Sequence, residues 1–352
     1  MGDSSSRDRK VRGRKIRSDR SKKKRRKAKK MAKKERKRAS NGTSGGSGRS
    51  GGSGGSSGSP LSSPEEIAPD PFVETDAVAS VRDRIVGWLE ADQPVHLIGP
   101  TGCGKTALAL SAAAERGRPV VWINGDEAVG TAELVGTHSG GERYEERDQF
   151  VSGVSKTTEV VRERWVDNPL STAVKEGATL VYNEFSRSDP AAHNVLLSVL
   201  EEGILERPGK HGEDRTIDVH PEFRLLVTSN DVEYAGVHEQ QDALLDRFVG
   251  VNVDYYDAET EREIVAAHVD VPEETIEQVV DAIRTLRDEL DVVVGTRAAI
   301  TAAEGLSVFT EDGAEEFDDE LLVDVFTDVL APKIAGDGDG IDDLRDAISD
   351  AL

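Results

Sequence analysis

Short apolar runs recur through the middle of the chain, separated by stretches in which apolar residues follow a helical period. Five runs predict buried strands: Pro94–Ile98, Pro119–Ile123, Ala178–Tyr182, Phe223–Thr228 and Phe248–Val253. Phe72–Ala91 and Gly104–Arg116 have the spacing of helices that bury one face. Short apolar strands that alternate with helices are typical of a parallel sheet covered on both faces. The pattern therefore predicts an α/β domain with a central parallel sheet.

After Asp257 the strand pattern stops and only helical periodicity continues. Four further helices are predicted there: Glu259–Val269, Glu273–Leu290, Arg297–Phe309 and Asp319–Ile334. We therefore expect two folded domains, a sheet domain over residues 71–257 and a small all-helical domain over residues 258–352.

The first 70 residues carry no such pattern. Lys and Arg dominate residues 7–38, and like charges at this density, with few apolar residues to bury, predict a disordered basic tail over residues 1–40. Residues 41–59 are almost wholly Gly and Ser, which predicts a flexible linker over residues 41–70.

The formal net charge of −22 divides very unequally along the chain. Residues 1–50 hold 22 Lys and Arg against four acids, a charge of +18, so the rest of the chain carries −40. Residues 51–352 contain only five lysines, which are Lys105, Lys156, Lys175, Lys210 and Lys333. A Lys-poor, carboxylate-rich surface resembles proteins of salt-loving organisms, where salt screens the self-repulsion. An ordinary acidic surface is the alternative.

Composition excludes several classes of protein. The single cysteine, Cys103, excludes a disulfide scaffold and a multi-cysteine metal site. The absence of a run of 18 apolar residues predicts no membrane span. The N-terminus lacks the apolar core of a signal peptide, which predicts a cytoplasmic protein.

One motif follows the first predicted strand directly and opens the next helix. It fits G-x-x-x-x-G-K-[ST] and consists of Gly99, Pro100, Thr101, Gly102, Cys103, Gly104, Lys105 and Thr106. Its glycines let backbone N–H groups wrap phosphates at a helix N-terminus. Lys105 is expected to reach the β- and γ-phosphates of ATP, and the Thr106 hydroxyl to bind Mg²⁺. Cys103 is expected to be a spacer rather than a reactive thiol.

Two polar residues follow the strand Ala178–Tyr182. Glu184 is the candidate base that polarises the attacking water, with an uninvolved surface glutamate as the alternative. Asn183 stands where an acid is expected, and a neutral amide holds Mg²⁺ less strongly than a carboxylate. We therefore expect Asn183 to be a weak Mg²⁺-shell residue, which leaves open a protein that binds ATP and hydrolyses it slowly. The seven scattered histidines predict no other metal.

Three further residues are candidates for contact with the γ-phosphate. Asn230 ends the fourth strand and is able to bind the γ-phosphate or the attacking water, unless it serves an Asx-turn. Arg247 is a candidate arginine finger for a neighbouring subunit, with an ion pair to Asp246 or a nearby acid as the alternative. Arg297 opens a helix of the second domain, where it either contacts the γ-phosphate or lies on the surface.

The order and spacing of these motifs over about residues 71–335 resemble AAA+ ATPases, and most of all the MoxR branch with its CbbQ and NorQ members. Tyr182–Lys210 and Val219–Phe248 are similar to the GvpN family of gas vesicle proteins, and the basic tail resembles its haloarchaeal members. The resemblance implies an AAA+ nucleotide-binding domain over 71–257 and a helical lid over 258–352. It also implies a homo-oligomeric ring with ATP at subunit interfaces, and the site roles given above. Asn183 departs from the family, which mostly has Asp there.

The same resemblance implies a function and partners. It predicts a remodelling ATPase that promotes gas vesicle assembly or growth by acting on shell or accessory proteins, in the cytoplasm and in association with the vesicles. The alternatives are a MoxR-type chaperone that matures a metalloenzyme, a nucleotide-gated binding protein with slow turnover, and a polyanion-binding or nucleic-acid-binding protein. Nucleic-acid binding is not favoured, and sequence-specific reading is not expected, because the tail has no aromatic residues for base stacking. Gly136–Arg147 and Glu206–Val219, the second a predicted hairpin, are candidate client contacts or uninvolved loops.

Overall fold

The computed structural model of the protein describes residues 60–148, 156–230, 242–289, 293–309, 319–333 and 338–351. Residues 59–352 form one compact unit, separate from residues 1–58. The predicted basic tail and residues 41–59 of the predicted linker lie outside the described residues.

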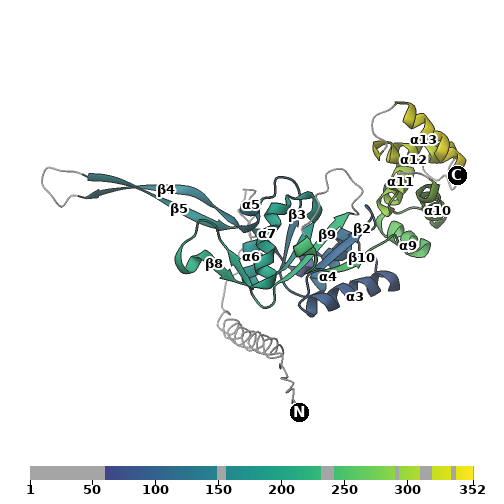
Figure 1. Cartoon of the computed structure of the whole chain (residues 1–352). Coiled ribbons are helices and arrows are strands. Elements are labelled where there is room, and N and C mark those ends of the chain that lie inside the picture. Colours follow the sequence, from purple (N-terminus) through teal and green to yellow (C-terminus); the bar gives the residue numbers. More distant parts are fainter. Residues whose placement is uncertain are drawn as a thin grey trace, which may run out of the picture. The chain divides into compact units, whose positions relative to one another are not determined.

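A six-stranded sheet lies at the centre of the part that the structure describes (Figure 1). Its strands are β1 (Leu61–Ser62), β2 (Val95–Gly99), β3 (Val120–Asn124), β6 (Thr179–Asn183), β9 (Arg224–Asn230) and β10 (Val249–Asn252). They lie side by side in the order β1-β3-β6-β9-β2-β10. All neighbours pair in parallel except β1, which runs antiparallel to β3. The five predicted strands and the parallel sheet are therefore confirmed.

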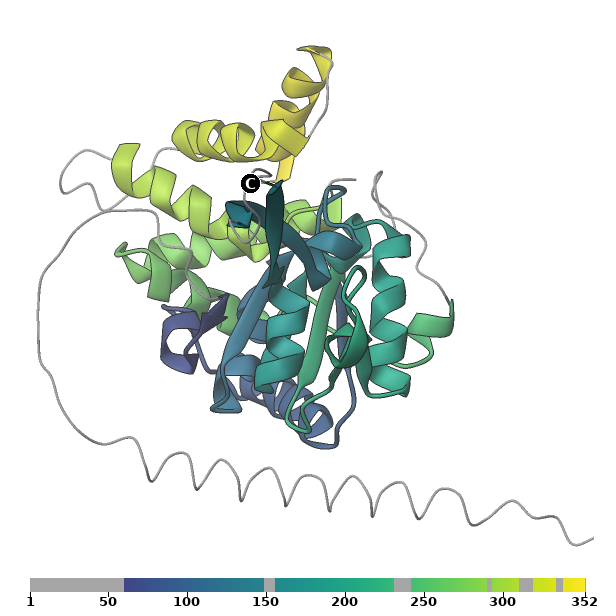
Figure 2. The same cartoon turned by 90° about the vertical axis from the view of Figure 1, so that its left-hand side faces the viewer.

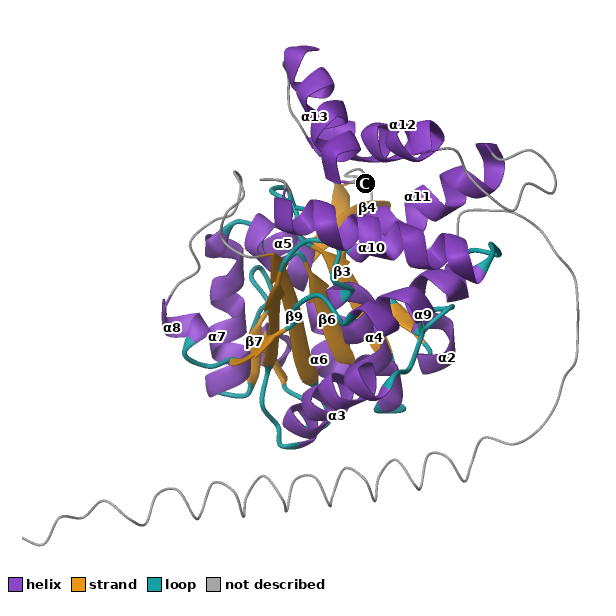
Figure 3. Ribbon diagram, turned by 90° about the vertical axis from the view of Figure 1, so that its right-hand side faces the viewer, coloured by secondary structure: helices purple, strands orange, loops and turns teal. Residues whose placement is uncertain are grey.

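Helices cover both faces of this sheet (Figure 3). Leu180 packs with α6 (Pro169–Glu176) and α7 (Asn194–Glu201), whereas its neighbour Val181 packs with α3 (Asp76–Glu90) and α4 (Lys105–Glu115). Successive side chains of a strand point to opposite faces, so a strand that is buried on both faces must be apolar throughout. This explains why a strand such as β6, which is buried throughout, appears in the sequence as a mainly apolar run.

The C-terminal residues form a group of helices with a core of their own, coloured green to yellow in Figure 2. They are α9 (Ala258–His268), α10 (Glu273–Glu289), α11 (Thr296–Phe309), α12 (Asp319–Leu330) and α13 (Gly338–Ala351). The first four match the predicted helices, and α13 lies within the predicted helical domain without having been predicted as a helix. Of the helices described, none combines the length and the apolar character needed to cross a membrane.

Folded structure begins earlier than the sequence indicated. Leu61 of β1 pairs with Val121, and α2 (Pro64–Ile67) follows with a Ser63 capping box. Residues 60–70, which we assigned to the linker, thus include two short elements of the fold. A two-residue strand and a four-residue helix are too short to show a period, so only their partners reveal them.

The Gly136–Arg147 segment is a strand rather than a loop. β4 (Gly136–Asp148) pairs antiparallel with β5 (Lys156–Asp167) in a long two-stranded ribbon (Figure 1). Its strands are polar over most of their length and lack the alternation that marks a half-buried strand, which is why the pattern missed it. The predicted hairpin in Glu206–Val219 is confirmed by β7 (Ile204–Glu206) and β8 (Thr216–Asp218).

The remaining elements are short helices. They are α5 (Thr131–Val135), η1 (Phe185–Arg187), η2 (Pro190–His193), η3 (Gly212–Arg215), α8 (Asp242–Leu245) and η4 (Ala331–Lys333).

Candidate active site

The P-loop connects the carboxyl end of β2 to the first turn of α4. Gly102 and Gly104 have φ of +83° and +90°, in the left-handed region that only glycine adopts without strain. A β-carbon on Gly99 would lie 1.8 Å from the Val253 carbonyl oxygen, so the backbone passes β10 too closely for a side chain. No side chain caps the N-terminus of α4. The backbone N–H groups of that first turn therefore face the loop that would hold an anion.

Lys105 is buried at this turn and folds back over the loop. Its Nζ donates to the carbonyl oxygens of Gly99, at 2.8 Å, and Pro100, at 2.6 Å. Both acceptors belong to the P-loop, so the ammonium group lies against the loop that is expected to hold the phosphates.

A chain of polar side chains joins the P-loop helix to the ends of three strands. The Thr106 hydroxyl donates to Asn183 Oδ1 at 2.7 Å, and the Thr228 hydroxyl donates to the same oxygen at 2.8 Å. Asn183 Nδ2 donates to Asn124 Oδ1 at 3.0 Å. A carboxylate would lack the donor for Asn124, so the amide at position 183 links all three partners. Asn124 was missed by the sequence analysis, although its place directly after the run Pro119–Ile123 was a usable signal.

These oxygens have the chemistry that suits Mg²⁺. Hydroxyl and amide oxygens are hard ligands, and Mg²⁺ is usually held by one or two protein groups together with phosphates and waters. Thr106 and Asn183 fit such a shell, and their oxygens are neutral, as the sequence indicated.

Glu184 is the residue directly after Asn183. Its backbone adopts φ +52°, which is uncommon for a residue with a side chain and costs energy that the surroundings must supply. Its N–H donates to the Thr228 hydroxyl at 3.1 Å, and its carboxylate accepts from Arg187 Nη1 at 2.5 Å. The carboxylate remains 38% exposed. Water can therefore reach it, as a general base requires.

Asn230 and Arg297 both lie beside the P-loop. Asn230 is paired in register with Gly99, so β9 brings it to the first residue of the motif. A β-carbon on Gly102 would lie 3.9 Å from Cβ of Arg297, and one on Gly295 would lie 2.6 Å from the Thr101 carbonyl oxygen. This close approach of two backbones brings the start of α11 against the loop, and Arg297 with it.

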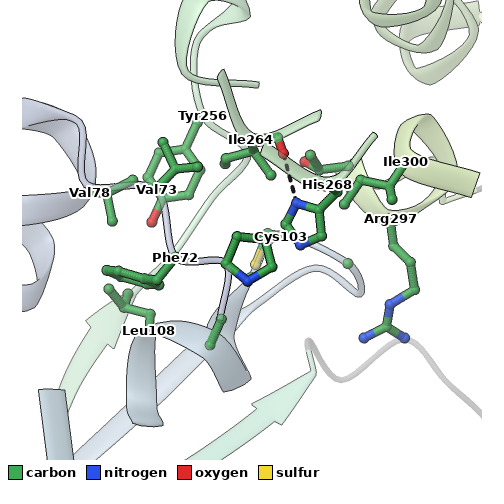
Figure 4. A pocket seen from close by; sticks show the side chains of 15 residues that line it. Phe72, Val73, Val78, Cys103, Leu108, Tyr256, Ile264, His268, Arg297 and Ile300 are labelled. Carbon is green, nitrogen blue, oxygen red and sulfur yellow. Dashed lines mark hydrogen bonds between the residues drawn. The ribbon is translucent and has the colours of Figure 1, made fainter. Parts of the chain in front are cut away.

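A pocket of about 220 Å³ opens between the P-loop and the helical domain. Phe72, Val78 and Ile264 line one part of it, and Arg297 lies at the other end (Figure 4). An apolar end beside a phosphate-binding loop suits a flat heterocyclic base. The sequence analysis missed this pocket, because its apolar residues cannot be told from core residues before the fold is known.

Cys103 lies beneath the loop and is almost fully buried. Its thiol donates to the Val253 carbonyl at 3.5 Å, and burial raises the pKa of the thiol although Lys105 opposes the shift. A buried thiol with a raised pKa is a poor nucleophile. This agrees with its expected place as a spacer.

Arg247 has partners within its own chain. Its guanidinium forms an ion pair with Glu201 of α7 and donates to the Ala243 carbonyl. The partner is thus Glu201 rather than Asp246, and the side chain remains 30% exposed. The described residues bring together the P-loop, Asn183, Asn230 and Arg297, and they place Arg247 in this separate ion pair.

Comparisons with known proteins agree with this geometry. Residues 94–248 match the family described as "AAA domain (dynein-related subfamily)". The chain is 58% identical over 281 residues to the "Gas vesicle ATPase GvpN2" of Halobacterium salinarum, with 80% of each chain covered. It is 27% identical over 213 residues to "Protein CbbQ" of Hydrogenophilus thermoluteolus, covering 59% of this chain and 72% of CbbQ.

Among solved structures, NtrX from Brucella abortus in complex with ADP matches with a TM-score of 0.50 at 17% identity, covering 82% of this chain and 64% of NtrX. At that identity the likeness shows a shared fold alone. The AAA+ fold and the MoxR-type relatives expected from the sequence are confirmed. Identity of 58% over four-fifths of the chain decides the family. The chain belongs to the GvpN family of gas vesicle ATPases, which carry an AAA domain.

Proposed function

We propose that the protein hydrolyses ATP at the P-loop and uses the energy to promote gas vesicle assembly or growth. One observation carries the catalytic part of this proposal. The P-loop, the polar ends of β6 and β9, and Arg297 converge on one place, where a triphosphate would lie between Lys105 and Glu184.

In this mechanism the apolar end of the pocket takes the adenine and the P-loop N–H groups take the phosphates. Lys105 leaves the carbonyls of Gly99 and Pro100 and binds β- and γ-phosphate oxygens. Glu184 takes a proton from a water, whose oxygen attacks the γ-phosphorus as the bond to ADP breaks. Asn230 orients that water or binds the γ-phosphate, and Arg297 stabilises charge on it. Thr106, and more weakly Asn183, would hold Mg²⁺, which would neutralise phosphate charge.

Arg247 has its proposed role in a neighbouring subunit of a ring. Its pairing with Glu201 is partly exposed, so the guanidinium is able to exchange this partner for the phosphates of the adjacent site. Glu201 would then hold the side chain ready in the isolated subunit. A homo-oligomer is therefore part of the proposal.

The client is proposed to be a gas vesicle shell or accessory protein. The relative at 58% identity is named a gas vesicle ATPase, whereas CbbQ is far less similar, which favours this reading over a chaperone for a metalloenzyme. The ribbon β4–β5 and the hairpin β7–β8 are the proposed client contacts. The charge of −40 outside the first 50 residues supports work in a salty cytoplasm, in association with the vesicles.

The experiment is deletion of the gene followed by complementation. Wild type should restore full-sized, floating vesicles, and the Glu184→Gln variant, which is expected to bind ATP without turning it over, should not. Vesicles of normal size in the deletion strain would refute the role in gas vesicle formation. Loss of a metalloenzyme activity in that strain would favour the chaperone alternative.

A further inference from the structure

Glu261 of α9 is a carboxylate buried within the helical domain. Its side chain is 1% exposed and lies between two arginines of α10. Arg284 Nη1 donates to Oε2 at 2.9 Å, and Arg287 Nη2 donates to Oε1 at 2.8 Å. Burying a charge is costly unless it is paired and hydrogen-bonded, and replacing such a group by an apolar one is often neutral for stability. Stability alone therefore does not account for a buried carboxylate with two guanidinium partners.

The same carboxylate holds the segment that leads into α11. The Thr296 hydroxyl donates to Glu261 Oε1 at 2.7 Å, and Arg287 Nε donates to the Val294 carbonyl at 2.7 Å. Lys333 Nζ donates to the Val293 carbonyl at 2.6 Å. Residues 293, 294 and 296 are thus each fixed by a side chain of the helical domain, directly before Arg297.

This segment is where the helical domain meets the P-loop. Gly295, between two of the fixed residues, approaches Thr101 and Gly102 too closely to carry a β-carbon. A second connection runs through Tyr255, whose hydroxyl donates to the Thr101 carbonyl at 3.1 Å. The Arg287 guanidinium lies 3.8 Å from the centre of the Tyr255 ring. Both connections start from the Glu261–Arg287 pair and end at Thr101.

We propose that Glu261 is a positioning residue for ATP hydrolysis. Through Thr296 and Arg287 it holds Arg297 and the P-loop in the relative position at which Arg297 contacts the γ-phosphate. The inference rests on the proposed contact between Arg297 and the γ-phosphate. It goes beyond that contact, because it proposes that a buried ion cluster, which itself touches no nucleotide, sets the distance between the helical domain and the P-loop. A change at this cluster should alter discrimination between ATP and ADP while the fold persists.

The test compares the affinity for the non-hydrolysable analogue AMP-PNP with the affinity for ADP, by calorimetry on the full chain in molar salt. Thr296→Val removes one hydroxyl and leaves the buried charges paired, so it keeps the helical domain folded. Glu261→Gln is the stronger variant, and circular dichroism checks that it folds. Thr285→Val and Asp281→Asn are matched controls, since they remove a hydroxyl bond and an exposed ion pair from the same domain.

Thr296→Val and Glu261→Gln are expected to lower the AMP-PNP preference about tenfold, to the level of Arg297→Ala, while ADP affinity stays within about twofold. The controls should keep the wild-type preference, and Thr296→Val combined with Arg297→Ala should lose no more than Arg297→Ala alone. If Arg297→Ala loses the preference and Thr296→Val keeps it, the role of Glu261 is overturned and that of Arg297 stands. If Arg297→Ala itself keeps the preference, the proposed γ-phosphate contact fails, and the positioning role fails with it.

Discussion

Gly295 is the position at which one added methyl group tests whether the helical domain must touch the P-loop. A β-carbon there would lie 2.6 Å from the Thr101 carbonyl oxygen and 3.0 Å from Gly102 Cα, whereas ordinary contacts begin at 3.4 Å. Both obstacles are backbone atoms and cannot rotate away. The helical domain would have to move from the loop by about 1 Å, and a displacement of that size can cost about 100-fold in rate. We expect Gly295→Ala to lower kcat/KM for ATP by about 10- to 100-fold.

The assay is steady-state release of phosphate, with thermal unfolding measured on the same samples. Gly87→Ala is the matched control, because a β-carbon on Gly87 of α3 meets nothing within 4 Å. In a helix interior this change should leave the rate unaltered and stabilise the protein by up to about 1 kcal/mol. A Gly295→Ala protein with wild-type kcat/KM would refute the reasoning, since the contact would then be dispensable.

Two further predictions follow from the strand ends and the sheet. Asn183→Asp should lower the Mg²⁺ concentration for half-maximal ATPase activity, because a carboxylate holds Mg²⁺ more strongly than an amide. It should change kcat by less than about tenfold, because Asp keeps an acceptor for the Thr106 and Thr228 hydroxyls and loses only the bond to Asn124; a gain of several orders of magnitude would instead favour slow hydrolysis by the native protein. His96, buried against Ser229, has its pKa lowered by burial to about 4, so the unfolded chain binds the proton more readily. Acidification from pH 6.5 to 4 should therefore cost about 3 kcal/mol of stability. In denaturant titrations His96→Gln should lose less stability than wild type over this range, and an equal loss in both proteins would contradict the assignment.

Much of the sheet domain was predictable because its local signals agree with the fold. The five apolar runs are the parallel strands of the sheet, and the residues of the P-loop motif are consecutive in the sequence. Glu184 follows β6 and Asn230 ends β9, two strands whose carboxyl ends meet at one edge of the sheet. Asn124 obeys the same rule and was within reach.

Other parts depend on tertiary contacts that no local pattern carries. Glu261 lies in a charged stretch of α9 that is typical of an exposed helix surface, and its burial depends on Arg284 and Arg287 of α10 and on the Thr296 hydroxyl. The pocket beside the P-loop combines Phe72 with residues of α9 and α11, which are far apart in the sequence. The partner of Arg247 is likewise set by where α7 packs rather than by its neighbour Asp246.

The measurement that tests the central claim most directly is ATP turnover in molar salt by wild type, Lys105→Ala and Glu184→Gln. The account predicts turnover by wild type, loss of nucleotide binding in Lys105→Ala, and retained binding with a rate at least about 100-fold lower in Glu184→Gln. Turnover that is unchanged by both substitutions would contradict hydrolysis at this site.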